Sequence, residues 1–375
     1  NVYPIELRKQ PLPPPPVLST VPIWKTRRGI IGAAILILAI IGAIVGIAAS
    51  TGAKKSKIPE ASGAGGTSIN STVAALGGGG VAAVNWPSNA STSQQVRLYI
   101  QKDDGFVYEA ASDQNDLWNP NTTKLFRAKA GTPLAAVAPA PSQVHLYYLD
   151  TSNILQEYIY NGSWAKGATP LPSTNIAPIT SLAATTWIDS SSVLNIRLYY
   201  QKQDNTIQEL VYSPGSGWSS GYSFTDQAYP GAGLGAFATY FNKALFTSVY
   251  WQANDLNVHE YVYTSSWSTN MFKWSAAPSS GITAIGWPDT SSNRPQIRVY
   301  YENTARSVEE VSYGYPSGWI GNVPINTLVD IPAPISATVW LSGGVEVRSY
   351  VKSNSSNVHI EFAYSGGWTS KILSF

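Results

Sequence analysis

The sequence IRLYYQKQDNTIQELVYSPGSGW, residues 196–218, contains the pattern that decides the fold. Two segments with alternating side chains, 196–201 and 207–212, flank a polar turn, and the pair Gly217-Trp218 follows them. Alternation with a period of two is typical of β-strands. The pattern occurs six times at intervals of about 50 residues, and each copy has a glutamate in its second segment: Glu109, Glu157, Glu209, Glu260, Glu310 and Glu361.

Repeats of this length that consist of short strands are typical of a β-propeller with one blade per repeat. Each repeat contains four expected strands. The first ends in an aromatic residue in several copies, such as Trp187 and Trp287, and the fourth follows the recurrent tryptophan. No part of the repeats has a helical period. The sequence predicts an all-β, six-bladed propeller of four-stranded antiparallel blades over residues 81–375, preceded by a single transmembrane helix.

Three segments of different composition precede the repeats. Residues 1–28 are basic and rich in proline, and we expect them to be disordered. Residues 29–49 are uncharged and mostly apolar over a length that spans a bilayer as a helix. Residues 50–80 are rich in Gly, Ala and Ser, which is typical of a flexible linker. For residues 29–49, a buried core helix and a cleaved leader are the alternatives, although a secretory leader has a shorter apolar region.

Charges beside residues 29–49 predict the orientation of this helix. Five basic residues precede it, at 8, 9, 25, 27 and 28, and three follow it, at 54, 55 and 57. This excess favours a single-pass protein with a cytosolic N-terminus and an extracellular or lumenal propeller. The alternative is secretion after cleavage. Export agrees with five Asn-x-Ser/Thr sequons, at Asn70, Asn89, Asn121, Asn161 and Asn354.

The composition argues against several classes of function. Charged residues make up only 12% of the chain and the net charge is +2, so there is no basic surface for nucleic acid. The absence of cysteine excludes disulfides and thiolate chemistry. The three histidines, His145, His259 and His359, lie in different repeats, which argues against a histidine metal site. We therefore expect neither a metal nor another cofactor.

An arginine occupies one position of the second strand in four repeats, at Arg97, Arg197, Arg298 and Arg348. In the first three of these repeats the glutamate follows 12 residues later. Folding the two strands about their midpoint makes arginine and glutamate directly opposed partners on one face. A tyrosine follows the glutamate by three residues in most repeats, and this odd offset places it on the other face. Arginine and glutamate of one blade should thus face tyrosine and tryptophan of the next.

These residue types are suited to a neutral sugar. Arginine only donates hydrogen bonds, ionised glutamate only accepts them, and a sugar hydroxyl does both. Aromatic rings provide a flat apolar wall for the C–H face of a sugar ring. Because the two charges cancel, the site should prefer uncharged ligands. The structural alternatives are a surface ion pair and aromatic packing between blades.

The motif Ile-Arg-Leu-Tyr-Tyr-Gln, followed by Asn-Thr-Ile-Gln-Glu and Gly-Trp, resembles the repeat of fungal fucose-specific lectins of the Aleuria aurantia type. The resemblance covers residues 81–375 and all six repeats. It implies a six-bladed propeller that binds L-fucose between its blades. It also implies that arginine and glutamate hydrogen-bond the sugar hydroxyls, while aromatic side chains of the next blade pack on the sugar and its methyl group.

Carried over position by position, the resemblance implies three complete sites, on alternate blades. The first comprises Arg97, Glu109, Tyr160 and Trp164. The second comprises Arg197, Glu209, Tyr263 and Trp267. The third comprises Arg298, Glu310, Tyr364 and Trp368.

The other three clefts depart from the pattern. His145 replaces arginine beside Glu157, opposite Tyr212 and Trp218. Ser248 replaces it beside Glu260, opposite Tyr313 and Trp319. In the last repeat Glu361 follows Arg348 by 13 residues, and Ser112 stands where the first blade should supply a tyrosine. A shift of one residue moves a side chain to the other face unless the hairpin holds an extra residue.

The sequence therefore predicts a non-catalytic, multivalent lectin whose partners are L-fucose and fucosylated glycans, with a membrane contact through residues 29–49. The alternatives are a membrane-tethered protein-interaction propeller without sugar binding and, less favoured, a glycosidase. A glycosidase needs two carboxylates in one pocket, whereas the repeated glutamates occur once per blade. The oligomeric state stays open, with a homodimer among the options.

Overall fold

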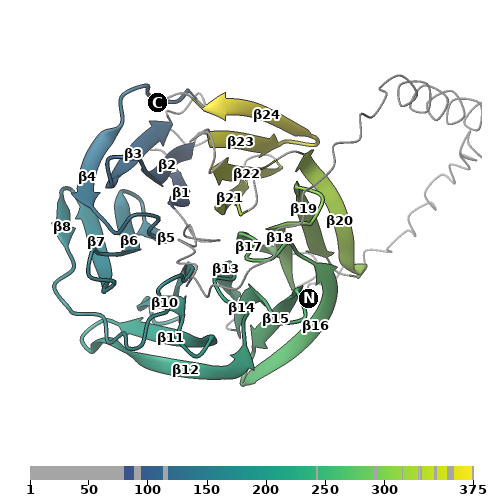
Figure 1. Ribbon diagram of the computed structural model, residues 1–375, viewed down its shortest axis with the longest axis horizontal. Helices are drawn as coiled ribbons and strands as arrows, with labels where there is room; N and C mark the ends of the chain where they lie inside the picture. The colour runs from purple at the N-terminus through teal and green to yellow at the C-terminus, as the bar shows by residue number, and fades with distance from the viewer. Residues whose placement is uncertain are drawn as a thin grey trace, which may run out of the picture. The chain divides into compact units, whose positions relative to one another are not determined.

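The computed structural model describes residues 80–87, 94–112, 117–241, 244–289, 294–314, 316–327, 329, 332–341, 344–352 and 359–373. Over these ranges, strands β1 to β24 form six four-stranded antiparallel sheets, each made of four consecutive strands. Figure 1 shows the sheets arranged as blades around a central axis, with the first strand of a blade innermost and the fourth outermost. The expected six-bladed propeller is confirmed.

Blades 1 to 3 cover the first half of the repeats. Blade 1 contains β1 (Val81–Pro87), β2 (Gln94–Gln101), β3 (Phe106–Ser112) and β4 (Thr123–Arg127). Blade 2 contains β5 (Leu134–Ala140), β6 (Gln143–Leu149), β7 (Leu155–Asn161) and β8 (Trp164–Lys166). Blade 3 contains β9 (Leu182–Ile188), β10 (Leu194–Gln201), β11 (Thr206–Ser213) and β12 (Gly217–Gln227).

Blades 4 to 6 complete the ring. Blade 4 contains β13 (Leu234–Phe241), β14 (Ala244–Gln252), β15 (Asn257–Tyr263) and β16 (Trp267–Ser275). Blade 5 contains β17 (Ile282–Asp289), β18 (Arg294–Glu302), β19 (Ser307–Gly314) and β20 (Gly318–Thr327). Blade 6 contains β21 (Ile335–Leu341), β22 (Val345–Lys352), β23 (His359–Tyr364) and β24 (Trp368–Leu373).

The hydrophobic core lies between neighbouring blades. Every strand alternates its side chains between two faces, so each sheet buries apolar residues on both sides. One cluster joins blades 2 and 3 through residues such as Val137 and Leu198. Another joins blades 6 and 1 through Tyr350 and Leu98. The same packing thus recurs at every joint, including the one between the two ends of the repeat array.

The turn between the second and third strands has one form in blades 1 to 5. Near the start of each third strand one residue adopts a left-handed conformation, with φ between 62° and 79°: Gly105, Asn153, Asn205, Leu256 and Arg306. Glycine and asparagine adopt this conformation readily, whereas leucine and arginine do so only where the surroundings impose it. Because the turn is the same, the register between the second and third strands is the same in these blades.

Polar side chains at the end of the second strand link consecutive blades. The Gln101 amide donates to the carbonyl of Lys129 at 2.8 Å. The fully buried Glu302 carboxylate accepts from the backbone N–H groups of Gly281 at 3.0 Å and Ala333 at 2.7 Å. Backbone donors of this kind help to satisfy a buried carboxylate. These bonds fix each blade against the next.

The ring closes without exchange of strands. Blade 1 and blade 6 are each built from one continuous part of the chain. Between them the Ala83 N–H donates to the Ser336 hydroxyl at 2.9 Å, and the Lys352 ammonium donates to the Gln101 carbonyl at 3.0 Å. Side-chain packing and a few hydrogen bonds therefore close the propeller.

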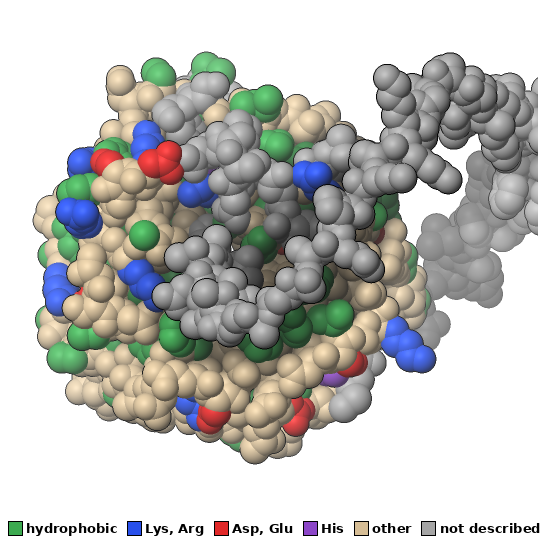
Figure 2. Space-filling model, in the orientation of Figure 1, with side chains coloured by type: hydrophobic (Ala, Val, Ile, Leu, Met, Phe, Trp, Pro, Cys, Tyr) green, Lys and Arg blue, Asp and Glu red, His purple; other side chains and the backbone are tan. Residues whose placement is uncertain are grey.

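The propeller axis holds cavities of different sizes, which the first strands of all six blades line. First strands of all six blades line a cavity of about 40 Å³ through apolar side chains such as Leu134, Leu182 and Ile282. Cavities of about 90 Å³ and 190 Å³ are lined by other residues of the same six strands, such as Ala135 and Thr185. In Figure 2 the charged side chains of the visible face are few and lie mainly toward its periphery. The recurrent charged and aromatic side chains lie between the blades, and the candidate sites are therefore there.

The expected membrane helix, residues 29–49, lies outside the described residues, as do the N-terminal tail and almost all of the linker. Among the residues that the structure describes, no helix has the length and apolar character needed to cross a bilayer.

Candidate functional site

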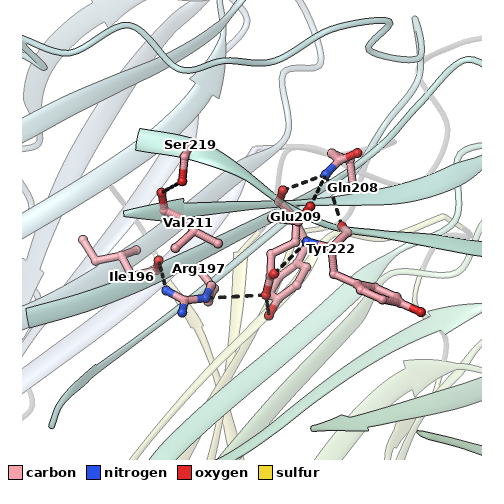
Figure 3. A network of polar contacts seen from close by, with 9 residues as sticks. Ile196, Arg197, Gln208, Glu209, Val211, Ser219 and Tyr222 are labelled. Carbon is pink, nitrogen blue, oxygen red and sulfur yellow. Dashed lines mark hydrogen bonds and ion pairs between the residues drawn. The ribbon is translucent and has the colours of Figure 1, made fainter. Parts of the chain in front are cut away.

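The recurrent arginine and glutamate lie on the same face of a blade, but they are not directly opposed as predicted. In blade 3 Arg197 pairs with Val211, and Glu209 pairs with Tyr199. The register is shifted by two residues because the turn centres on Asp204, one position beyond the assumed midpoint. Since the shift is even, both side chains still share a face. They are diagonal neighbours, and Figure 3 shows Arg197 and Glu209 pointing toward each other.

The diagonal geometry recurs in the three blades predicted to carry complete sites. The distance from arginine Nε to glutamate Oε1 is 3.8 Å for Arg97–Glu109, 3.6 Å for Arg197–Glu209 and 3.5 Å for Arg298–Glu310. The arginine side chains are 19–25% exposed and the glutamates 9–19% exposed. These pairs are thus partly withdrawn from solvent but remain open to a ligand.

Each of these arginines is held by three contacts. In blade 3, Nη1 donates to the Ile196 carbonyl at 3.0 Å and Nε faces Glu209. The guanidinium carbon lies 4.8 Å from the ring centroid of Trp187, which belongs to the first strand of the same blade. The Nη2 atom donates to none of the described residues. The guanidinium is therefore fixed in place with two N–H donors left for a ligand.

The stacking tryptophan was not assigned a role from the sequence. It occurs beside each of the four arginines, at 4.8–5.3 Å: Trp86, Trp187, Trp287 and Trp340. Blade 4 lacks the arginine and has Thr239 at the corresponding register position. An attraction of this kind contributes about 0.5–2 kcal/mol. The tryptophan occurs in the same four repeats as the arginine, and this co-occurrence is the sequence signal that could have revealed its role.

A buried tyrosine directly opposite the glutamate was also missed. Its hydroxyl donates to the carboxylate at 2.5–3.1 Å in blades 1 to 5. The five residues are Tyr99, Tyr147, Tyr199, Tyr250 and Tyr300. They stand two positions after the arginine, or after the His145 or Ser248 that replaces it, and this even offset is the sequence signal. Burial and the nearby carboxylate raise the pKa of Tyr199 well above its usual value, so the phenol stays a neutral donor.

The next blade supplies the aromatic wall, as the strand parity predicts. The ring of Trp164 lies edge-on to Tyr99 at 5.8 Å, and Trp368 lies edge-on to Tyr300 at 6.0 Å. Trp267 lies 5.9 Å from Tyr222 of blade 3. Each tryptophan also packs at 5.4–5.5 Å against the tyrosine of its own blade, which is Tyr160, Tyr263 or Tyr364. The residues of each predicted site are therefore brought to one inter-blade space.

Desolvation acts on the site carboxylates. Burial raises the pKa of Glu109 and of Glu310, while the facing arginine and tyrosine lower it again in part. A carboxylate offers about four acceptor positions. The described residues that engage Glu109 and Glu310 are one arginine and one tyrosine in each case. Each carboxylate thus retains capacity to accept hydrogen bonds from a ligand.

In blade 2 the glutamate is already engaged by the protein. His145 Nδ1 lies 2.8 Å from Glu157 Oε1, and Tyr147 donates to the same oxygen. The Trp218 indole of the next blade, which packs at 5.5 Å on Tyr212, donates to Glu157 Oε2 at 3.3 Å. The predicted neighbours are brought together, but they use most of the acceptor positions.

In blade 6 the 13-residue spacing does not change the face. Arg348 pairs with Ala363 and Glu361 with Tyr350, the same diagonal relation as in the other blades. The extra residue falls in the loop between β22 and β23. The Glu361 carboxylate is shared by Arg348 Nε at 3.2 Å, Lys371 Nζ at 2.9 Å and the Trp118 indole of blade 1 at 2.8 Å.

In blade 4 Ser248 stands where the other blades have arginine or histidine, and none of the described arginines forms an ion pair with Glu260. Tyr250 and the Asn270 amide donate to its carboxylate, the latter at 2.8 Å. A pocket of about 220 Å³ opens here, and its lining includes Ser248, Glu260, Tyr313 and Trp319. The residues predicted for this cleft do line one pocket, in which Glu260 forms an ion pair with none of the described residues.

The three Arg–Glu sites combine charged donors, charged acceptors and aromatic walls. This set of groups can hold vicinal hydroxyls on a compact sugar ring. No group of three or more histidine or acidic side chains within the described ranges is suited to holding a metal ion. The repeated glutamates lie one per blade, which differs from the paired carboxylates of a glycosidase.

Comparisons with known proteins agree with this chemistry. The model of the family described as "Fungal fucose-specific lectin" matches residues 76–244 and 188–374. The chain is 33% identical over 245 residues to the fucose-specific lectin of Aleuria aurantia, covering 62% of this chain and 74% of that one. It is 27% identical over 289 residues to the fucose-specific lectin of Aspergillus oryzae, covering 74% and 87%.

Solved structures give the same result. The six-bladed propeller of Aleuria aurantia lectin superimposes with a TM-score of 0.65 at 28% identity, over 78% of this chain and 94% of that one. A mutant of that lectin in complex with α-methyl-L-fucoside gives a TM-score of 0.67 at 28% identity, over 79% and 94%. The family consists of carbohydrate-binding proteins rather than enzymes. The chain belongs to the fungal fucose-specific lectin family.

Proposed function

We propose that this protein is a non-catalytic lectin that binds L-fucose and fucosylated glycans between its blades. The observation that carries the proposal is the guanidinium of Arg97, Arg197 and Arg298, which is fixed by its own blade and keeps Nη2 available beside a glutamate. The likeness to lectins that bind fucosides supplies the identity of the sugar.

In each proposed site, two neighbouring blades contact the sugar. The arginine donates to the ring oxygen and to hydroxyl groups, and the glutamate accepts from hydroxyl groups. The tyrosine and tryptophan of the next blade cover the apolar side of the sugar, where the methyl group of fucose lies. Hydrogen bonds to charged groups contribute about 1.5–3 kcal/mol each, so arginine and glutamate should dominate the affinity.

Removal of the three arginines tests this assignment. We expect that fucose-agarose does not retain the triple variant Arg97→Ala, Arg197→Ala and Arg298→Ala, because each site loses a charged donor. Arg127→Ala is the matched control, since this exposed arginine lies at the end of β4, outside the sites. Undiminished retention of a folded triple variant would refute the site assignment, and hydrolysis of fucosides would favour a glycosidase.

Three complete sites on alternate blades would give the protein avidity. A glycan surface that presents several fucosyl groups at matching spacing engages several sites at once, which can raise the apparent affinity by about 10²–10⁴. A homodimer would double the number of sites. Light scattering on the purified chain measures whether one forms.

We also propose that residues 29–49 tether the propeller to a membrane, with the N-terminus in the cytosol. The apolar composition and the flanking basic residues support this proposal. Membrane fractionation tests it: recovery of the whole chain in the soluble fraction would contradict it and would favour secretion after cleavage.

A further inference from the structure

The pocket between blades 4 and 5 differs in kind from the Arg–Glu sites. Where an arginine stands in four other blades, blade 4 has Ser248, and where their tryptophan stands it has Thr239. Two large side chains are thus replaced by small ones. The result is the pocket of about 220 Å³ that Ser248 and Glu260 line from blade 4 and Tyr313 and Trp319 line from blade 5.

Glu260 gives this pocket an uncompensated negative charge. The residue is 3% exposed, and its hydrogen-bond partners, Tyr250, Asn270 and Ser248, are neutral. It forms an ion pair with none of the described residues, in contrast to the four recurrent glutamates that face an arginine. A buried carboxylate without a cation favours a ligand that brings a positive charge. The raised pKa of Glu260, caused by desolvation, agrees with this lack of compensation.

Aromatic rings form the rest of the pocket. Phe237 and Phe246 line it from blade 4, and Tyr313 and Trp319 line it from blade 5. Trp319 is held in place by Trp274 at 4.8 Å and Phe272 at 5.1 Å. Several aromatic rings around a carboxylate form the type of site that recognises organic ammonium groups through cation–π attraction and charge pairing.

We propose that the pocket between blades 4 and 5 binds a compact organic ammonium group, in place of fucose. The ligand's cation takes the position that arginine occupies in the other blades, beside Glu260 and against Trp319. The volume lies below the ~300–1,000 Å³ of sites for drug-sized ligands, so a head group such as choline or a protonated amino sugar fits the available space.

Arg294 orients such a ligand. It also lines the pocket but is exposed, and it pairs in register with Asp289 at the end of the β17–β18 ladder. Because like charges repel, the ammonium group should lie away from Arg294, beside Glu260.

Calorimetric titration of the full chain with choline chloride tests the proposal. Saturating α-methyl-L-fucoside is present throughout, so that the fucose sites are occupied. We expect one choline site per chain. Glu260→Gln and Ser248→Arg should each raise the choline Kd by about tenfold or more, because one removes the charge and the other neutralises it. Glu310→Gln is the matched control at an arginine-paired glutamate and should leave choline binding unchanged.

A second ligand pair tests the role of the charge. Glucosamine, which is cationic when protonated, should bind, whereas N-acetylglucosamine should not. Absence of choline binding would refute the proposal, as would displacement of choline by the fucoside or an equal effect of Glu310→Gln. Binding of fucoside by the other sites is measured separately, so the proposed lectin function and this inference can fail independently.

Discussion

The Tyr199 hydroxyl donates a hydrogen bond of 3.0 Å to Glu209 Oε1, the same oxygen that faces Arg197 Nε at 3.6 Å. A buried phenol thus sets the position of the carboxylate before any sugar arrives. The Tyr222 N–H of the fourth strand holds the other oxygen at 3.0 Å (Figure 3). Fixing the acceptor in advance reduces the entropy that a ligand must lose on binding.

Tyr199→Phe should weaken fucoside binding at the blade 3 site. The substitution keeps the ring but removes one donor to a buried carboxylate, a change that costs about 1–3 kcal/mol. The measurement is titration calorimetry with α-methyl-L-fucoside in an Arg97→Ala, Arg298→Ala background, which leaves blade 3 as the complete site. Tyr200→Phe is the control, because its hydroxyl bonds to Thr174 instead. An equal loss of affinity in both variants would show that side-chain packing, and not the hydrogen bond to Glu209, determines the fucoside affinity of this site.

Gly221→Ala should damage the same site from the fourth strand. A methyl group at this position would overlap Glu209 Oε2 and displace the carboxylate from Arg197. We expect at least a tenfold loss of fucoside affinity at blade 3, about 1.4 kcal/mol. Gly321→Ala in blade 5 is the control, since its added methyl group meets no atom closer than Val311 at 3.9 Å. Calorimetry that finds the blade 3 site intact would contradict the expected overlap.

Lys371→Ala should add a fucoside site between blades 6 and 1. Lys371 Nζ lies 2.9 Å from Glu361 Oε2 and uses acceptor capacity that a sugar hydroxyl needs. Arg348 and its stacking partner Trp340 are already in place. The number of fucoside sites per chain, measured by calorimetry, should rise by one. Lys166→Ala, an exposed lysine of β8, should leave that number unchanged. An unaltered stoichiometry in Lys371→Ala would contradict the expectation that Lys371 limits this site.

His359 should make the fold less stable in acid. Burial, with Lys352 and Lys102 nearby, lowers its pKa to about 4 from the ordinary value of 6.5. The unfolded chain therefore takes up a proton at higher pH than the folded protein. Stability should fall as the pH drops from 6.5 toward 4, by up to about 3 kcal/mol.

Denaturation of the native protein and of His359→Gln at pH 7.5 and 4.5 isolates this contribution. The raised pKa values of Glu109 and Glu310 act in the opposite direction, but equally in both proteins. Between pH 7.5 and 4.5, the unfolding free energy of the native protein should fall by more than that of His359→Gln. A constant difference would exclude this role for His359.

The sequence predicted the propeller because the recurrence of Glu109 through Glu361 and the strand alternation are both set locally. It predicted which face each residue occupies for the same reason, since faces depend only on odd or even offsets. It did not predict the register, because the residues that form the turn depend on where the chain becomes left-handed. In blade 3 this occurs at Asn205, with φ of 65°, which moves the centre of the hairpin to Asp204.

The missed site residues could be found only from the alignment of further strand pairs within each blade. The position of Trp187 beneath Arg197 depends on how the first strand pairs with the second, and the sequence does not specify that register. Lys371 was missed for a related reason. The fourth strand is the least regular, so its alignment with Glu361 could not be derived from the repeat.

The closure of the ring by ordinary inter-blade contacts has a consequence for how the chain can be rearranged. Because neither blade 1 nor blade 6 borrows a strand, the joint between them resembles the joints elsewhere. Circular permutants that join Leu373 to Val81 by a short linker and start at another blade should therefore fold. The order of the six blades, rather than the place where synthesis begins, determines the propeller.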